Sequence, residues 1–141
     1  MYLPRTPGYT TSDARMRWAL PERVFFACGA CHILAYAFLE RWARVDMRAI
    51  WIKPAPGYIG NHVFIDGGDW VFDYHGYSAK DRFLRHIQRG AQRRWPGWDA
   101  TFVELPMDVL VSEEASRKYE GLWLREPGQF LYNAMPRARN Y

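Results

Sequence analysis

The stretch NHVFIDGGDWVFDYHG, residues 61–76, constrains the fold more than any other part of this sequence. Two runs of apolar residues flank Gly67 and Gly68. A Gly-Gly pair in this setting is typical of a tight turn between antiparallel strands, with positive φ at both central residues. The stretch therefore predicts a β-hairpin, and with it an antiparallel sheet.

A turn centred on the two glycines also fixes which residues face one another across the hairpin. In that register Ile65 faces Trp70 and His62 faces Asp73. Directly opposed residues share one face of the sheet with Cβ atoms ~5 Å apart, which is close enough for a hydrogen bond between an imidazole and a carboxylate. The hairpin therefore predicts that Asp73 orients the ring of His62 and stabilises its protonated form.

The rest of the chain predicts helices and further strands around this hairpin, with little pattern in the tail, residues 130–141. We expect helices over 12–20, 31–44, 78–95 and 112–121, capped in three cases by Ser12, Ser78 and Ser112. We expect strands over 23–27 (strand or extended entry), 47–53 and 101–111 (one or two strands). Neither a repeat nor a domain boundary is visible. These patterns predict an α+β fold with a mainly antiparallel sheet, in a single domain spanning residues 1–141.

Composition sets outer bounds on function. With 49% hydrophobic and 17% aromatic residues, the chain of 141 residues predicts a packed core rather than disorder. The N-terminal stretch has no apolar core of signal-peptide length, and no apolar run is long enough to span a bilayer. We therefore expect a cytoplasmic protein without a membrane segment, although export by a route independent of a signal peptide stays open. Two cysteines do not make a disulfide scaffold.

The segment ACGACHILAYAF, residues 27–38, has the spacing of three different chemistries. Cys28, Cys31 and His32 have the spacing of a c-type haem attachment site, and the two cysteines alone have that of a dithiol redox pair. Cys31 also begins an apolar helical pattern, and a thiol at a helix N-terminus has a lowered pKa because the helix dipole favours its thiolate. In that third interpretation Cys31 is a nucleophile, and Gly29 lets the backbone approach it closely.

The rest of the chain favours the third interpretation. Haem attachment requires export, and a thioredoxin-like dithiol fold needs more strand and helix structure before Cys28 than this chain has. A zinc site built from the two cysteines, His32 and His75 would lack a second clean pair of ligands.

Two other histidines compete with His62 for the role of base. His32 follows Cys31 and would point about 100° away around the helix. His75 would face Gly60 across the hairpin, and glycine offers no carboxylate to orient it. We therefore expect His62 to be the base that serves Cys31.

In their order along residues 27–77, GACHILA, HVFI and WVFD resemble the core of the transglutaminase-like branch of the papain-like cysteine enzymes. That core has a cysteine on a helix, a histidine opening one strand and an aspartate closing the next, here Cys31, His62 and Asp73. The chain departs from the pattern in the additional Cys28 and in the three-residue spacing from Trp70 to Asp73. The resemblance implies a papain-like fold in which an N-terminal helix bearing the cysteine packs on a mainly antiparallel sheet.

The resemblance also implies an activity, that of a thiol-dependent hydrolase or acyltransferase of the protease, deamidase or transglutaminase type. Cys31 would attack the carbonyl carbon of an amide bond in a protein or peptide, His62 would transfer the proton, and Asp73 would hold His62. Such chemistry needs neither a metal nor an organic cofactor. The backbone N–H of Cys31 would be one oxyanion donor, and the second is left open among three side chains: Trp18, Tyr58 and Asn61.

Arginines recur at helical spacing between residues 82 and 93, in a chain whose net charge is +4. One interpretation is a non-catalytic binding domain that uses this basic helix, but a solvated helix face opposite the apolar residues Phe83, Leu84 and Ile87 is favoured. Nucleic acid is not a favoured partner, because no aromatic residues are interleaved with the arginines. A basic face near the site would suit an acidic protein substrate. The oligomeric state is left open.

Overall fold

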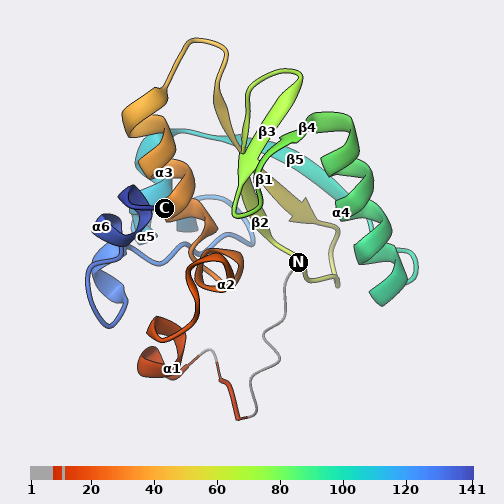
Figure 1. Ribbon diagram of the computed structural model, residues 1–141. Coiled ribbons are helices and arrows are strands. Elements are labelled where there is room, and N and C mark those ends of the chain that lie inside the picture. Colours follow the sequence, from red (N-terminus) through yellow and green to blue (C-terminus); the bar gives the residue numbers. More distant parts are fainter. Residues whose placement is uncertain (1–7, 11) are drawn as a thin grey trace.

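Five antiparallel strands form the centre of the computed structural model, which describes residues 8–10 and 12–141 (Figure 1). Residues 1–7, part of the stretch that lacks a signal-peptide core, lie outside the described residues. The strands lie in the order β4-β3-β2-β1-β5, and every neighbouring pair is antiparallel. Their bounds are β1 Arg48–Pro54, β2 His62–Asp66, β3 Trp70–Asp73, β4 Gly76–Ala79 and β5 Ala100–Leu105. The expected α+β class with an antiparallel sheet is confirmed.

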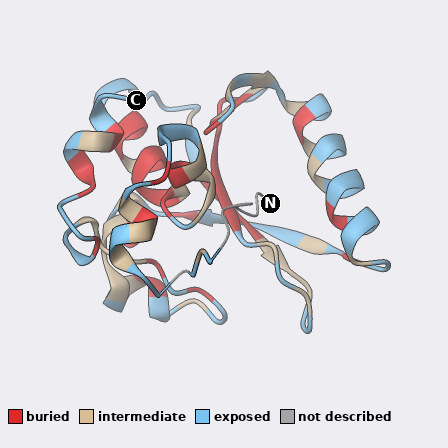
Figure 2. Cartoon of the chain, turned by 60° about the horizontal axis from the view of Figure 1, so that its bottom comes forward, coloured by how far each residue is buried: buried red, intermediate tan, exposed pale blue. Residues whose placement is uncertain are grey.

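Helices cover both faces of this sheet, as Figures 1 and 2 show. Helix α3 lies on one face and α4 on the other, and α2, α6 and η1 pack against α3. The helices are α1 Ala14–Trp18, α2 Glu22–Ala27, α3 Cys31–Trp42, α4 Lys80–Arg94, η1 Met107–Val111, α5 Glu113–Arg117, η2 Pro127–Gln129 and α6 Met135–Arg139. Within the described residues, none of them combines the length and the apolar character needed to cross a bilayer.

Strand β1 shows how the sheet is held between its two helical layers. Successive side chains of a strand point to opposite faces. Ala49 and Trp51 pack in the cluster beneath α3, whereas Ile50 and Ile52 pack with Phe83 of α4. All four of these β1 residues are buried. Because both faces are covered, the central residues 49–52 of the strand are all apolar rather than alternating with polar residues.

The hairpin between β2 and β3 forms as expected, but in a different register. Ile65 faces Phe72 instead of Trp70, because the turn is centred one residue later than the Gly-Gly pair. Gly68 alone of the two glycines has a positive φ, of 98°, and its N–H donates to the Asp66 carboxylate at 2.9 Å. This side-chain bond is typical of an Asx turn, which sets the centre of the hairpin.

This register places His62 diagonally to Asp73 rather than directly opposite it. Continued past Ile65, the pairing brings Phe64 opposite Asp73. The pairing is shifted by two residues, and a shift of two residues leaves each side chain on the same face of the sheet. His62 and Asp73 therefore still share a face. A diagonal pair is still within reach of long side chains.

The interpretation of residues 23–27 as a strand or extended entry is wrong, because they belong to α2. The N–H of Phe25 donates to the carbonyl of Pro21 at 2.8 Å, which closes the first helical turn. Phe25 and Phe26 are both fully buried. Adjacent buried residues give a short apolar run with no period, so sequence alone does not separate helix from strand here.

Two of the three expected serine caps are wrong. Asp13 rather than Ser12 caps α1, accepting hydrogen bonds from the N–H groups of Arg15 and Met16 at 3.0 Å. Ser78 lies in β4, and α4 begins two residues later without a side-chain cap. The Ser112 cap of α5 is confirmed, since its hydroxyl accepts from the N–H of Ala115 at 3.1 Å.

The C-terminal half differs from the expectation in two further places. Only the first part of 101–111 is a strand, because Pro106 ends β5 and the following residues form the 3-10 helix η1. The tail contains the helix α6, which packs on α3. Arg139 of α6 binds Glu40 of α3 with two hydrogen bonds, of 2.8 and 2.9 Å.

Candidate active site

Cys31 is the first residue of α3, and the local backbone leaves the N-terminus of this helix open. Gly29 has a φ of 102°, a value that favours glycine, and it turns the chain from α2 into α3. No side chain of residues 8–10 or 12–141 caps α3. The N–H groups of its first turn, and the positive end of the helix dipole, therefore lie beside the Cys31 thiol.

His62 and Asp73 are joined by a hydrogen bond of 3.0 Å between Nε2 of the ring and Oδ2 of the carboxylate. Both side chains are buried. Burial alone raises the pKa of the Asp73 carboxyl, but the hydrogen bond and charge of His62 outweigh it and lower that pKa. Because an ionised carboxylate only accepts, Nε2 of His62 carries the hydrogen, and Nδ1 is the ring nitrogen left for other chemistry.

Asp73 has a second partner at its other oxygen. The backbone N–H of His75 donates to Oδ1 at 2.8 Å, and Nδ1 of His75 lies 3.3 Å from the same oxygen. His75 lies in the turn that follows β3 and is exposed. The carboxylate is therefore held from two sides, which fixes the oxygen that faces His62.

The thiol of Cys31 and the ring of His62 shift each other's pKa in opposite directions. Burial raises the pKa of Cys31, but hydrogen bonds from His32 and His62 and the charges of these rings lower it to about 5. Burial lowers the pKa of His62, but hydrogen bonds to Asp73 and Cys31 raise it to about 9. At pH values between these two pKa values, the Cys31 thiolate and the His62 imidazolium coexist in the site.

His32 lies closer to Cys31 than the sequence predicts. Although it follows Cys31 on α3, it lines the same cleft as the thiol and lowers the pKa of Cys31. The ring is buried, and its Nε2 bonds the carbonyl of Arg125 at 2.6 Å. A carbonyl only accepts, so Nε2 carries a hydrogen and the ring is fixed in orientation. Within the described part of the chain no carboxylate bonds His32, whereas Asp73 bonds His62.

The two cysteines differ in chemical character although they are only three residues apart. Both are reduced. Burial, followed by the charge of Cys31, raises the pKa of Cys28 to about 11. At neutral pH Cys31 is therefore the thiolate and Cys28 the thiol. Among the described residues no three His, Cys, Asp or Glu side chains are arranged to hold a metal ion.

Cys31 and His62 open onto a cleft of about 240 Å³. Asn61 lies in the same cleft, and the indole N–H of the buried Trp51 donates to its Oδ1 at 2.8 Å. An indole nitrogen is a donor only, so this bond fixes the amide and leaves Nδ2 of Asn61 as its donor. The other lining residues are Ala27, Gly29, His32, Val63, Leu122, Trp123, Leu124 and Arg125.

The segment Leu122–Arg125 forms one wall of the cleft. It is held in place by Ser116 of α5, which is fully buried. The Ser116 hydroxyl accepts from the N–H of Leu124 at 2.9 Å and donates to the carbonyl of Glu113 at 2.8 Å. The side chain of Trp123 is left 63% exposed at the rim. The wall thus presents an aromatic surface beside the thiol.

Of the three residues considered as the second oxyanion donor, only Asn61 lines the cleft. Trp18 packs against Phe25 and Tyr132 instead. The hydroxyl of Tyr58 donates to the carbonyl of Pro96.

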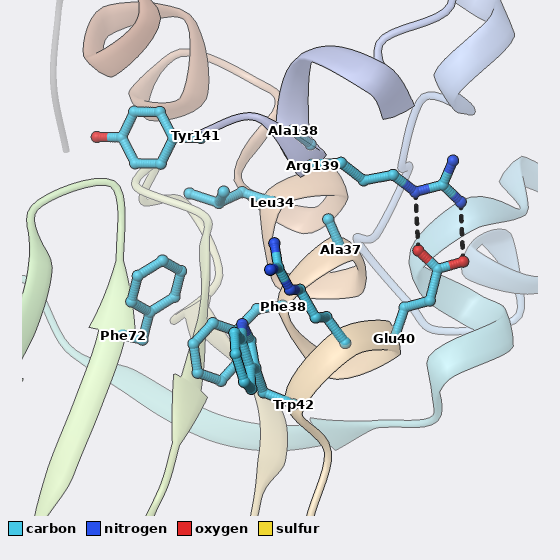
Figure 3. A pocket seen from close by; sticks show the side chains of 10 residues that line it. Leu34, Ala37, Phe38, Glu40, Trp42, Phe72, Ala138, Arg139 and Tyr141 are labelled. Atoms are coloured by element: carbon cyan, nitrogen blue, oxygen red, sulfur yellow. Dashed lines mark hydrogen bonds and ion pairs between the residues drawn. The ribbon is translucent and has the colours of Figure 1, made fainter.

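A second and larger cavity, of about 320 Å³, lies between α3 and α6 (Figure 3). Phe38, Phe72 and Trp42 give it an aromatic floor, and the pair of Glu40 and Arg139 closes one side. Among the described residues, no cysteine or histidine lines it. It therefore lacks the chemistry of the cleft at Cys31.

Comparison of the chain with protein-family models, with curated proteins and with solved structures finds no match. Sequence reasoning missed Trp51, whose apolar neighbours in β1 mark it only as a core residue. It also missed the wall formed by Leu122–Arg125, which carries no motif.

Proposed function

We propose that this protein is a thiol-dependent hydrolase or acyltransferase that acts on an amide bond of a protein or peptide. Cys31 is the nucleophile, His62 the general base and acid, and Asp73 the residue that orients His62. The observation that carries the proposal is that Cys31 and His62 line one cleft, with Asp73 bonded to His62 at 3.0 Å. The proposed fold is a papain-like, transglutaminase-like core.

In the first half of the reaction the Cys31 thiolate attacks the carbonyl carbon, and a C–S bond forms as the carbonyl π electrons move to oxygen. The Cys31 N–H and Nδ2 of Asn61 are the donors we assign to that oxyanion. As the C–N bond breaks, protonated His62 gives the hydrogen on Nδ1 to the departing amine. The product is a thioester on Cys31 and a neutral His62.

In the second half His62 takes a proton from water or from an attacking amine, whose oxygen or nitrogen adds to the thioester carbonyl. The C–S bond then breaks and returns the thiolate, and His62 remains protonated. Water gives hydrolysis, as in a protease or deamidase, and an amine gives acyl transfer. Asp73 stays ionised throughout and stabilises the imidazolium.

The shape of the site supports a peptide rather than a compact substrate. A further hollow of about 430 Å³ shares Trp51 and Asn61 with the cleft, and it extends past Lys53 to Glu120. The two hollows together form a groove that runs on beyond the thiol. An extended chain can lie along such a groove with its reacting amide over Cys31.

The test is acylation of Cys31 by p-nitrophenyl acetate, a small acyl donor that needs no specific recognition. We expect a burst of one equivalent of p-nitrophenol and an acetyl group that peptide mapping locates on Cys31. Cys31→Ala should remove both the burst and the adduct while circular dichroism shows an unchanged fold.

Cys28→Ser is the matched control, because the proposal uses one thiol whereas dithiol redox chemistry needs two. It should keep the burst. An unchanged burst in Cys31→Ala, or its loss in a folded Cys28→Ser, would overturn the proposed function.

A further inference from the structure

Helix α4 concentrates the positive charge of the molecule. It carries six basic residues and one acidic residue, so its net charge of +5 exceeds the +4 of the whole chain. Two of these charges are compensated, because Lys80 pairs with Asp66 and Arg85 pairs with Asp81. Arg82, Arg89 and Arg93 make no ion pair with any residue in the described part of the chain. Figure 2 shows the outer face of this helix exposed along its length.

This basic face is hollowed rather than flat. One hollow of about 370 Å³ is lined wholly by α4 residues, four of them arginines. A second, of about 290 Å³, lies between α4 and the turn that follows β3. The two share His86, Gly90 and Arg93.

Gly90 is the residue that opens these hollows. A Cβ at this position would meet no heavy atom within 4 Å, and its φ is not positive. Glycine in a helix interior weakens the helix relative to alanine. Neither packing nor backbone conformation therefore requires glycine here, and the missing side chain leaves space on a charged surface.

The spacing of the arginines matches an extended peptide. From Arg82 to Arg93 the helix advances about 16 Å at 1.5 Å per residue. About five residues of extended chain, at ~3.3 Å each, cover this length. The hollow lined by α4 alone contains four arginines with His86 and Gly90, so it offers nucleic-acid bases no Trp, Tyr or Phe ring to stack on. Tyr74 and Trp95 line only the neighbouring hollow. A line of guanidinium groups without such rings favours carboxylates over nucleic acid.

The basic face is connected to the candidate active site through three residues. His75 lines the hollow beside α4 and contacts the Asp73 carboxylate. Asp73 bonds His62, which lines the cleft at Cys31. A peptide bound on α4 would therefore lie beside His75, which contacts the carboxylate that is bonded to His62.

We propose that the outer face of α4, with Arg82, Arg89 and Arg93, docks an acidic, extended segment of a protein. That this protein is the substrate rests on the proposed function, whereas the docking itself does not. Carboxylates of the segment would pair with these three arginines, and the hollow at Gly90 would admit a side chain between them.

The test is binding of a fluorescein-labelled peptide of alternating glutamate and alanine, followed by anisotropy. Changing Arg89→Glu and Arg93→Glu together should weaken binding at least tenfold and reduce its dependence on salt. Arg41→Glu with Arg44→Glu is the matched control, because both arginines are exposed and the pair changes the net charge by the same amount. This control should bind nearly as the unmodified protein does.

Equal weakening in the two double variants would overturn the proposal, because it would show attraction to net charge rather than to α4. Tighter binding of a labelled single-stranded oligonucleotide, lost with the α4 variant, would overturn it in favour of nucleic acid. Cys31→Ala should bind the peptide with unchanged affinity. Docking on α4 without acylation of Cys31 would refute the proposed function and leave the docking site standing.

Discussion

His62→Ala is expected to lower the rate of Cys31 acylation by p-nitrophenyl acetate at neutral pH by on the order of 10²–10⁴-fold, the usual contribution of a general acid–base group. The variant loses the ring that lies in the cleft with the thiol and is bonded to the Asp73 carboxylate. Without it, the Cys31 pKa rises from about 5 towards its ordinary value, and the thiolate fraction at pH 7 falls. The measurement is the burst rate by stopped flow.

The loss must be separated from unfolding, because His62 is buried beside Asp73. Circular dichroism and a thermal melt of the same preparation supply that check. His86→Ala is a matched control on another element, since His86 is exposed on α4. An acylation rate in folded His62→Ala within about threefold of the unmodified protein would contradict the assigned role, since a general base contributes on the order of 10²-fold or more.

Asp73→Asn is expected to lower the acylation rate by about 10²-fold with the fold retained. Oδ1 of the new amide can still accept the N–H of His75, which donates to that oxygen at 2.8 Å. The amide NH₂ then faces Nε2 of His62, where the Asp73 carboxylate accepted a hydrogen. Two donors cannot meet, so His62 moves its hydrogen to Nδ1 and loses the lone pair that receives a proton.

The variant also changes the pH range of the reaction. Loss of the carboxylate lowers the pKa of His62 from about 9, and a less charged His62 raises the pKa of Cys31 from about 5. The pH range in which the Cys31 thiolate and the His62 imidazolium coexist therefore becomes narrower at both its acidic and its basic limit. A pH–rate profile of burst rates measures this narrowing, and a profile as wide as that of the unmodified protein would exclude the orienting role of Asp73.

The pairing of His62 with Asp73 could be predicted although the register was not. The prediction depends on the two residues sharing one face, and a shift of two residues preserves the face. The centre of the turn was missed because the Asp66 side chain, rather than the Gly-Gly pair alone, determines it. A shift of one residue would have separated the two side chains.

Other parts of the site depend on contacts between distant segments. The ring of His32 is oriented by the carbonyl of Arg125, 93 residues further along the chain. The wall that carries Trp123 depends on the buried hydroxyl of Ser116. Neither contact leaves a periodic or spaced pattern in the sequence, so only the folded chain shows them.

We propose that Cys31 is a thiolate activated by His62, and the pH dependence of its alkylation tests this proposal. Iodoacetamide labelling, with peptide mapping that separates Cys28 from Cys31, gives a rate for each thiol. We expect Cys31 to react with a midpoint near pH 5, and Cys28, with its pKa of about 11, to stay largely unlabelled at neutral pH. A Cys31 midpoint near the ordinary thiol value of about 8.5, unchanged in His62→Ala, would contradict the account.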